Sequence, residues 1–108
     1  MGPQIFLCYL VDVPPGTSKV VSPKELNSPV LVANLGGTIR VTTAICPHED
    51  VMFAEGPLSE TTITCHGHGY QFDLDSGQCL HDKSLCLTRY KALVAEGQIT
   101  IEGIPLPK

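Results

Sequence analysis

Cysteine and histidine occur in two close pairs along this chain, and these pairs are the residues best able to do chemistry. Cys46 and His48 form a C-x-H pattern, and Cys65 and His68 form a C-x-x-H pattern after a gap of sixteen residues. Thiolates suit iron–sulfur clusters and zinc, whereas imidazoles suit zinc, copper and iron. Two thiolates and two imidazoles are enough ligands for one metal centre, so the spacing predicts a metal site built from two loops.

The composition of each pair bears on which metal centre it holds. A zinc finger usually places two cysteines in one pair and two histidines in the other. Here each pair contains one cysteine and one histidine, which favours a cluster of two unlike irons. Each loop would then give its cysteine to one iron and its histidine to the other. A structural zinc module is the alternative. His66 lies between the ligands of the second pair and is an alternative to His68, which the C-x-x-H spacing and the following Gly69 favour.

Short β-prone runs separated by turns surround both pairs, and helical periodicity is hard to find. The first Cys/His pair follows the expected strand at 39–43, and the second pair follows the expected strand at 61–64. Each pair therefore lies in a loop at the end of a strand, and the two loop tips can face each other. We expect a hairpin turn at 34–37, a turn at 55–57 and at most a single helical turn at 51–55. The expected strands lie at 5–11, 17–21, 30–33, 39–43, 61–64, 70–72, 92–95 and 99–101.

Size, charge and cysteine content narrow the class of protein. The 108 residues, 43% of them hydrophobic and 17% charged, suit one small folded domain. A net charge of −4 argues against binding to nucleic acid or to an anionic membrane, and it suits a partner with a basic face. We find no run of about 20 apolar residues for a membrane helix and no signal-peptide pattern. The odd count of five cysteines argues against a disulfide framework, so we expect a cytoplasmic protein.

Residues 46–50, 65–73 and 76–77 together resemble the Rieske domain, and more narrowly the small Rieske ferredoxins of bacterial multicomponent aromatic-ring oxygenases. The resemblance implies an all-β fold, an antiparallel β-sandwich with a small inserted cluster-binding subdomain. It implies a single domain over 1–108 with that subdomain at about 44–85. It also implies one Rieske 2Fe-2S cluster, with Cys46 and Cys65 on the buried iron and His48 and His68 on the outer iron, near solvent.

The same resemblance implies a function without a catalytic step of its own. The protein would carry single electrons from a flavin-dependent reductase to a terminal oxygenase of aromatic hydrocarbon catabolism. Both partners would dock transiently near His48, His66 and His68, and the electron would leave through the outer imidazoles. The alternative is a Rieske-like accessory subunit of a larger redox enzyme such as a nitrite reductase.

Departures from the wider Rieske pattern indicate a low reduction potential. Respiratory and photosynthetic Rieske proteins add one cysteine to each loop as a disulfide, but Val51 and Gly67 stand at those positions here. Those proteins also place serine and tyrosine hydroxyl groups near the cluster. This chain has Tyr70 and Phe72 at the corresponding positions, and Phe72 has no hydroxyl group. Because fewer hydrogen bonds to the sulfurs stabilise the reduced cluster less, we expect the low end of the Rieske range, about −150 mV.

The remaining cysteines and one histidine are expected to have no part in the site. Cys8 and Cys86 lie in apolar runs and are expected to be buried thiols. Cys79 is expected to be exposed and open to oxidation, and His81 to lie on the surface. Asp73 and Asp75 are expected to belong to a turn.

Overall fold

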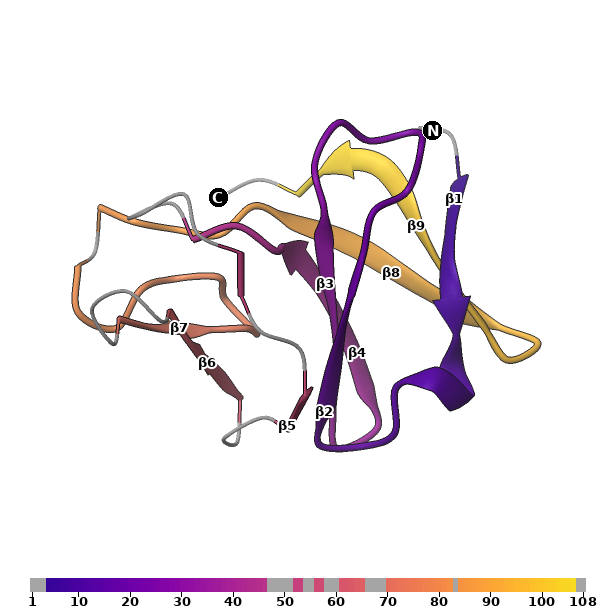
Figure 1. The fold of residues 1–108 in the computed structure, drawn as a ribbon, viewed down its shortest axis with the longest axis horizontal. Helices are drawn as coiled ribbons and strands as arrows, with labels where there is room; N and C mark the ends of the chain where they lie inside the picture. Colours follow the sequence, from indigo (N-terminus) through magenta and orange to yellow (C-terminus); the bar gives the residue numbers. More distant parts are fainter. Residues whose placement is uncertain are drawn as a thin grey trace.

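The computed structural model describes residues 4–46, 52–53, 56–57, 61–65, 70–82 and 84–106, with 56–57 as backbone. Its elements are short strands and one 3-10 helix, which confirms the all-β prediction (Figure 1). In chain order they are β1 (Gln4–Tyr9), η1 (Leu10–Asp12), β2 (Thr17–Val21), β3 (Val30–Leu35), β4 (Thr38–Thr43), β5 (Gly56–Pro57), β6 (Thr62–Thr64), β7 (Gln71–Asp73), β8 (Arg89–Ala95) and β9 (Gln98–Pro105).

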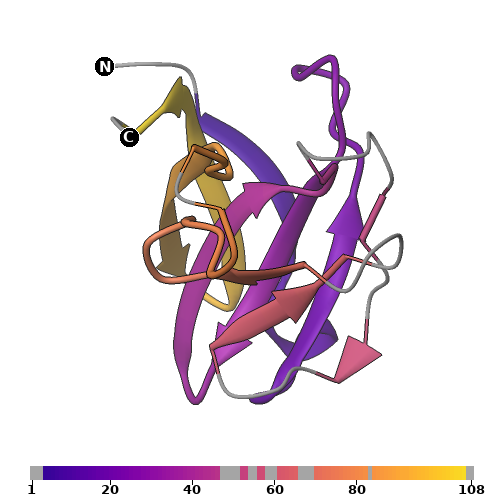
Figure 2. The same ribbon diagram turned by 90° about the vertical axis from the view of Figure 1, so that its left-hand side faces the viewer.

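The strands form one large antiparallel sheet and one separate hairpin. The large sheet has the strand order β1-β9-β8-β4-β3-β2-β5, and β6 and β7 form a two-stranded sheet of their own. The large sheet curls so strongly that β1 and β9 pack against β3 and β4 around a common core. The β6–β7 hairpin lies to one side of this sheet, and Figure 2 views the molecule from that side.

Strand β3 separates two hydrophobic cores, which explains the apolar run at 30–33 in its first four positions. Val30 and Val32 face the core shared with β1 and β9. Leu31 and Ala33 point the other way, into a second core beneath the β6–β7 hairpin. Because successive side chains of a strand point to opposite faces, a strand covered on both faces needs apolar residues at every position.

The hairpin between β3 and β4 was expected, but its turn is tighter than the sequence suggests. Gly36 and Gly37 make the turn, with φ of +65° and +107°. Asn34, expected in the turn, lies in β3 with only 3% of its surface exposed. Its side-chain Oδ1 accepts a hydrogen bond from the Gly37 N–H at 2.7 Å, and its Nδ2 donates to the Val13 carbonyl at 2.8 Å.

Other local expectations need correction. Gly56 and Pro57 were expected in a turn but form β5, which pairs with Ser18 and Thr17 of β2 at the edge of the sheet. An edge is the place where a strand tolerates proline. Most of the single helical turn expected at 51–55 lies outside the described residues. Strand β8 begins at Arg89, three residues earlier than expected. Among the described residues, no helix is long and apolar enough to cross a membrane.

Candidate metal centre

The two cysteines of the motifs lie buried in the same hydrophobic core. Cys46 is 0% exposed and Cys65 is 1% exposed. All five cysteines are free thiols. The core that contains both motif cysteines also contains Leu31, Ala33, Ala44, Phe53, Ile63, Phe72, Leu74, Cys79 and Leu87. Two residues that are nineteen positions apart in the sequence are therefore brought into one apolar environment, as expected for ligands of a buried metal.

The two segments that flank the loop after Cys46 are paired with each other. Strand β4 ends at Thr43, and the Phe53 N–H then donates to the Ala44 carbonyl at 2.7 Å. Ile45 and Met52 form an isolated antiparallel bridge next to it. These contacts close a hairpin whose tip begins with Cys46. His48 follows Cys46 by two positions in the sequence and lies outside the described residues.

The loop that follows Cys65 is closed in the same way. Thr64 of β6 pairs with Gln71 of β7, and the Cys65 N–H donates to the Tyr70 carbonyl at 2.7 Å. His66 and His68 follow Cys65 in the sequence and lie outside the described residues. Cys46 and Cys65 therefore each stand at the buried start of a loop whose flanking segments are hydrogen-bonded to each other.

A third segment, with the described residues 78–82 and 84–86, packs beside the β6–β7 hairpin. The Leu80 N–H donates to the Gln71 carbonyl at 2.8 Å. The ring centroid of His81 lies 5.6 Å from that of Tyr70, with an angle of 30° between the ring planes. His81 is exposed, as predicted. Its ring packs against that of Tyr70, whose carbonyl closes the Cys65 loop, a contact that no local sequence pattern predicts.

The prediction that Cys79 is exposed was wrong. Cys79 is 2% exposed because it bridges to Phe72 across the second hairpin and joins the core with both motif cysteines. Its Sγ also accepts a hydrogen bond from the His81 N–H at 3.4 Å. Cys86, expected to be buried, is half-buried, and Cys8 is buried as expected but in the other core. Burial makes the largest contribution to raising the pKa of the Cys8 thiol, and the negative charge of the Asp12 carboxylate raises this pKa further.

The environment of the two motif cysteines fits a metal cluster in a dry, apolar setting. Phe72 is 0% exposed and its ring lies 5.8 Å from that of Phe53, nearly edge to face. Both aromatic rings share the core with Cys46 and Cys65, and neither carries a hydroxyl. Among the described residues, no three Cys, His, Asp or Glu side chains are grouped to hold a metal.

A comparison with protein families identifies this arrangement. The family model described as the Rieske [2Fe-2S] domain matches residues 4–91. The chain belongs to the Rieske [2Fe-2S] domain family. The cofactor of this family is one 2Fe-2S cluster, and the buried pair Cys46 and Cys65 supplies the kind of thiolate ligands that such a cluster requires.

Individual Rieske proteins resemble the whole or most of the chain. The chain is 34% identical over 80 residues to the ferredoxin component of an alkene monooxygenase system from Xanthobacter autotrophicus. The aligned region covers 73% of this chain and 66% of that relative's length. A chain in the complex of reduced oxygenase and oxidized ferredoxin of carbazole 1,9a-dioxygenase superposes with a TM-score of 0.86 at 24% identity, over 97% of each chain.

A third likeness is to a protein of Mycobacterium tuberculosis described as the small subunit of an NADH-dependent nitrite reductase. Its TM-score is 0.81 at 20% identity, covering 98% of this chain and 99% of that chain. At such identities the two solved structures show a shared fold. They confirm the predicted Rieske fold and leave the choice between the two functions to other observations.

Proposed function

We propose that this Rieske protein is a one-electron carrier that takes electrons from a flavin-dependent reductase and passes them to a terminal oxygenase. The observation that carries the proposal is the placement of Cys46 and Cys65 at the buried entrances of two closed hairpins within one core. Support comes from the similarity to the ferredoxin component of an alkene monooxygenase system. The solved complex of a similarly folded ferredoxin with its oxygenase supports it further.

In this proposal Cys46 and Cys65 bind the buried iron of the cluster, while His48 and His68 bind the outer iron. The bound cluster supplies reversible one-electron oxidation and reduction. The chain's own residues hold it: the cysteines bind from the apolar core, and Phe53 and Phe72 exclude water from that side. We assign the whole of 1–108 to one Rieske domain, with its cluster-binding subdomain at about 44–85.

The partners would dock transiently at the loop tips that contain His48, His66 and His68. With a net charge of −4, the protein would associate with a basic docking face at a higher rate than an uncharged protein would, because opposite charges attract. The rate of electron transfer should therefore fall as ionic strength rises, because salt screens charges over about 10 Å at 0.1 M. We place this exchange in the cytoplasm, with no role for nucleic acid or a membrane.

Three cysteine variants test the ligand assignment. Cys46→Ser and Cys65→Ser should each lose the cluster, because each removes a thiolate from the buried iron. Cys86→Ser is the matched control, since Cys86 is a half-buried thiol outside the core of the motif cysteines. Iron and acid-labile sulfide per chain, together with the visible spectrum, are the readouts. Full cluster content in Cys65→Ser would contradict the assignment.

A second candidate function is an accessory subunit of a larger redox enzyme, which the likeness to the protein described as a nitrite reductase small subunit favours. The same ligands would then serve a fixed complex rather than a diffusing carrier. Co-purification of the protein with a large subunit at constant stoichiometry would support this candidate. Multiple turnovers of a separate oxygenase by catalytic amounts of free protein would support the carrier.

A further inference from the structure

The turn that follows β7 forms without the help of the Asp75 side chain. Asp73 provides its two main hydrogen bonds: its carboxylate accepts from the Asp75 N–H at 2.8 Å, and its carbonyl accepts from the Gly77 N–H at 2.6 Å. Ser76 Oγ accepts from the Gln78 N–H at 3.2 Å. The carboxylate of Asp75 takes part in none of these bonds, so removing its charge should leave the turn intact.

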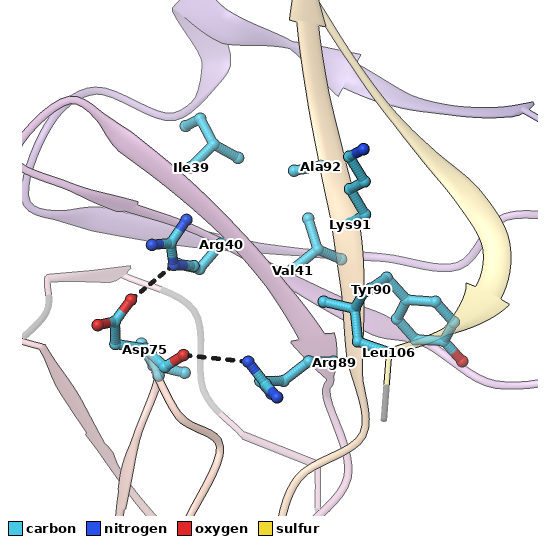
Figure 3. A pocket seen from close by; sticks show the side chains of 10 residues that line it. Ile39, Arg40, Val41, Asp75, Arg89, Tyr90, Lys91, Ala92 and Leu106 are labelled. Atoms are coloured by element: carbon cyan, nitrogen blue, oxygen red, sulfur yellow. Dashed lines mark hydrogen bonds and ion pairs between the residues drawn. The ribbon is translucent and has the colours of Figure 1, made fainter. Parts of the chain in front are cut away.

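Asp75 instead connects the turn to two neighbouring strands of the large sheet. Its carboxylate accepts a hydrogen bond at 2.7 Å from Nε of Arg40, on β4. Its backbone carbonyl accepts a longer bond of 3.4 Å from Nη1 of Arg89, on β8. Figure 3 shows both guanidinium groups directed at this one residue. We call Arg40, Asp75 and Arg89 the arginine clamp.

The arginine clamp crosses a groove between the sheet and the turn. Two pockets, of about 330 and 230 Å³, are both lined by Arg40 and Asp75. Leu74, next to Asp75, is fully buried and anchors the hairpin by packing in the core. Apolar packing is non-directional, whereas a hydrogen-bonded ion pair has a preferred geometry. Packing therefore keeps the hairpin attached, and the clamp adds a directional restraint on its orientation.

The clamp joins the two segments that bear the proposed cysteine ligands. Strand β4 carries Arg40 and leads into the Cys46 loop three residues after it ends. The turn with Asp75 lies at the end of the β6–β7 hairpin opposite Cys65, beyond the pair Thr62 and Asp73. We propose that Arg40, Asp75 and Arg89 are positioning residues, which hold the Cys65 hairpin at a fixed orientation to the Cys46 loop and so keep the cluster bound. The inference rests on the proposed ligand set.

The size of the effect follows from the exposure of the ion pair. The side chains of Arg40 and Asp75 are 42% and 60% exposed. An ion pair of this kind contributes little to stability and is screened by salt. Asp75→Asn should therefore bind a normal amount of cluster but lose it about two- to fivefold faster under a chelator, the range expected for a surface ion pair. The EPR lines of the reduced protein should broaden, because a less restrained hairpin admits more cluster geometries.

The test compares cluster loss from the purified, cluster-loaded protein and its variants. Glu25→Gln is the matched control, since Glu25 is an exposed carboxylate and its loss changes the net charge equally. Asp75→Glu, which restores the carboxylate, should recover much of the wild-type rate. Asp75→Asn combined with Arg40→Gln should lose the cluster no faster than either single variant, because each change removes the same ion pair. At about 1 M salt, where the Debye length is about 3 Å, the difference between wild type and Asp75→Asn should shrink.

Amide hydrogen exchange gives a readout that does not depend on cluster chemistry. The Leu74 N–H donates to the Thr61 carbonyl at 2.8 Å, at the base of the second hairpin, and should exchange faster in Asp75→Asn than in Glu25→Gln. Equal rates of cluster loss in these two variants, or additive effects of Asp75→Asn and Arg40→Gln, overturn the proposal while the proposed function stands. A wild-type protein that binds no cluster overturns the proposed function and this proposal together.

Discussion

Replacing Gly77 by alanine should destabilise the protein more than the same change at any glycine with a similar backbone but open surroundings. Gly77 has a φ of +83°, in the left-handed region. A Cβ built there would lie 2.8 Å from the Leu87 carbonyl oxygen and 3.2 Å from Cδ of Arg89. The Arg89 side chain can move, but the Leu87 carbonyl is backbone. The Gly77 carbonyl also accepts the Leu87 N–H at 2.6 Å, so the two segments cannot separate without losing that bond.

Gly16 provides the control that separates the two contributions. Its φ is +85°, and nothing lies within 4 Å of the position that its Cβ would take. Gly16→Ala should therefore cost only the left-handed backbone, about 1–2 kcal/mol. Gly77→Ala should cost that amount plus about 1–3 kcal/mol for overpacking. At about 5 °C per kcal/mol for a domain of this size, Gly77→Ala should unfold about 5–15 °C below Gly16→Ala.

Thermal unfolding of the two cluster-loaded variants, followed by far-UV circular dichroism at one heating rate, measures this difference. Coincident melting curves would refute the reasoning, because they would mean that the Leu87 carbonyl yields without cost.

Three more predictions concern the cores. Phe72→Ala should cost about 3–5 kcal/mol, because Phe72 is fully buried beside the motif cysteines; an unchanged melting temperature and iron content would argue against its role. Asn34→Ala should cost about 1–3 kcal/mol, because it leaves the Val13 carbonyl without its side-chain donor; urea denaturation measures the loss, and a cost near zero would exclude it. Burial, with a contribution from Asp12, raises the pKa of Cys8 above the ordinary value of 9.0, so the folded state keeps a proton that the unfolded state releases. The stability of wild type relative to Cys8→Ala should be constant below pH about 8 and fall as pH rises through about 9; a difference that rises with pH would contradict this.

Much of the sheet could be predicted from local patterns in the sequence. The β-prone run at 17–21 matches β2, and the glycine pair after β3 marks the turn before β4. The missed features depend on partners distant in sequence. Gly56 and Pro57 are typical turn residues, and only pairing with β2 makes them a strand. Cys79 follows a turn-like sequence, and only the bridge to Phe72 buries it.

The motif cysteines could be predicted from the sequence, whereas the arginine clamp could not. Spacing alone singled out Cys46 and Cys65, because mixed Cys/His pairs are unusual outside metal sites. The arginine clamp could not be predicted, since Arg40 and Asp75 are 35 residues apart and charged residues at such separations carry no pattern. The roles of His48, His66 and His68 stay predictions, because these residues lie outside the described part of the chain.

A redox titration of the purified protein, monitored by EPR, tests the central claim most directly. The account predicts a red-brown protein with two irons per chain, an anisotropic signal of low average g after reduction, and a potential near the low end of the Rieske range, about −150 mV. A colourless protein containing zinc would contradict the cluster itself. A potential above roughly +100 mV would contradict the low-potential assignment, because it would require the hydrogen bonds to the cluster that Phe72 cannot donate.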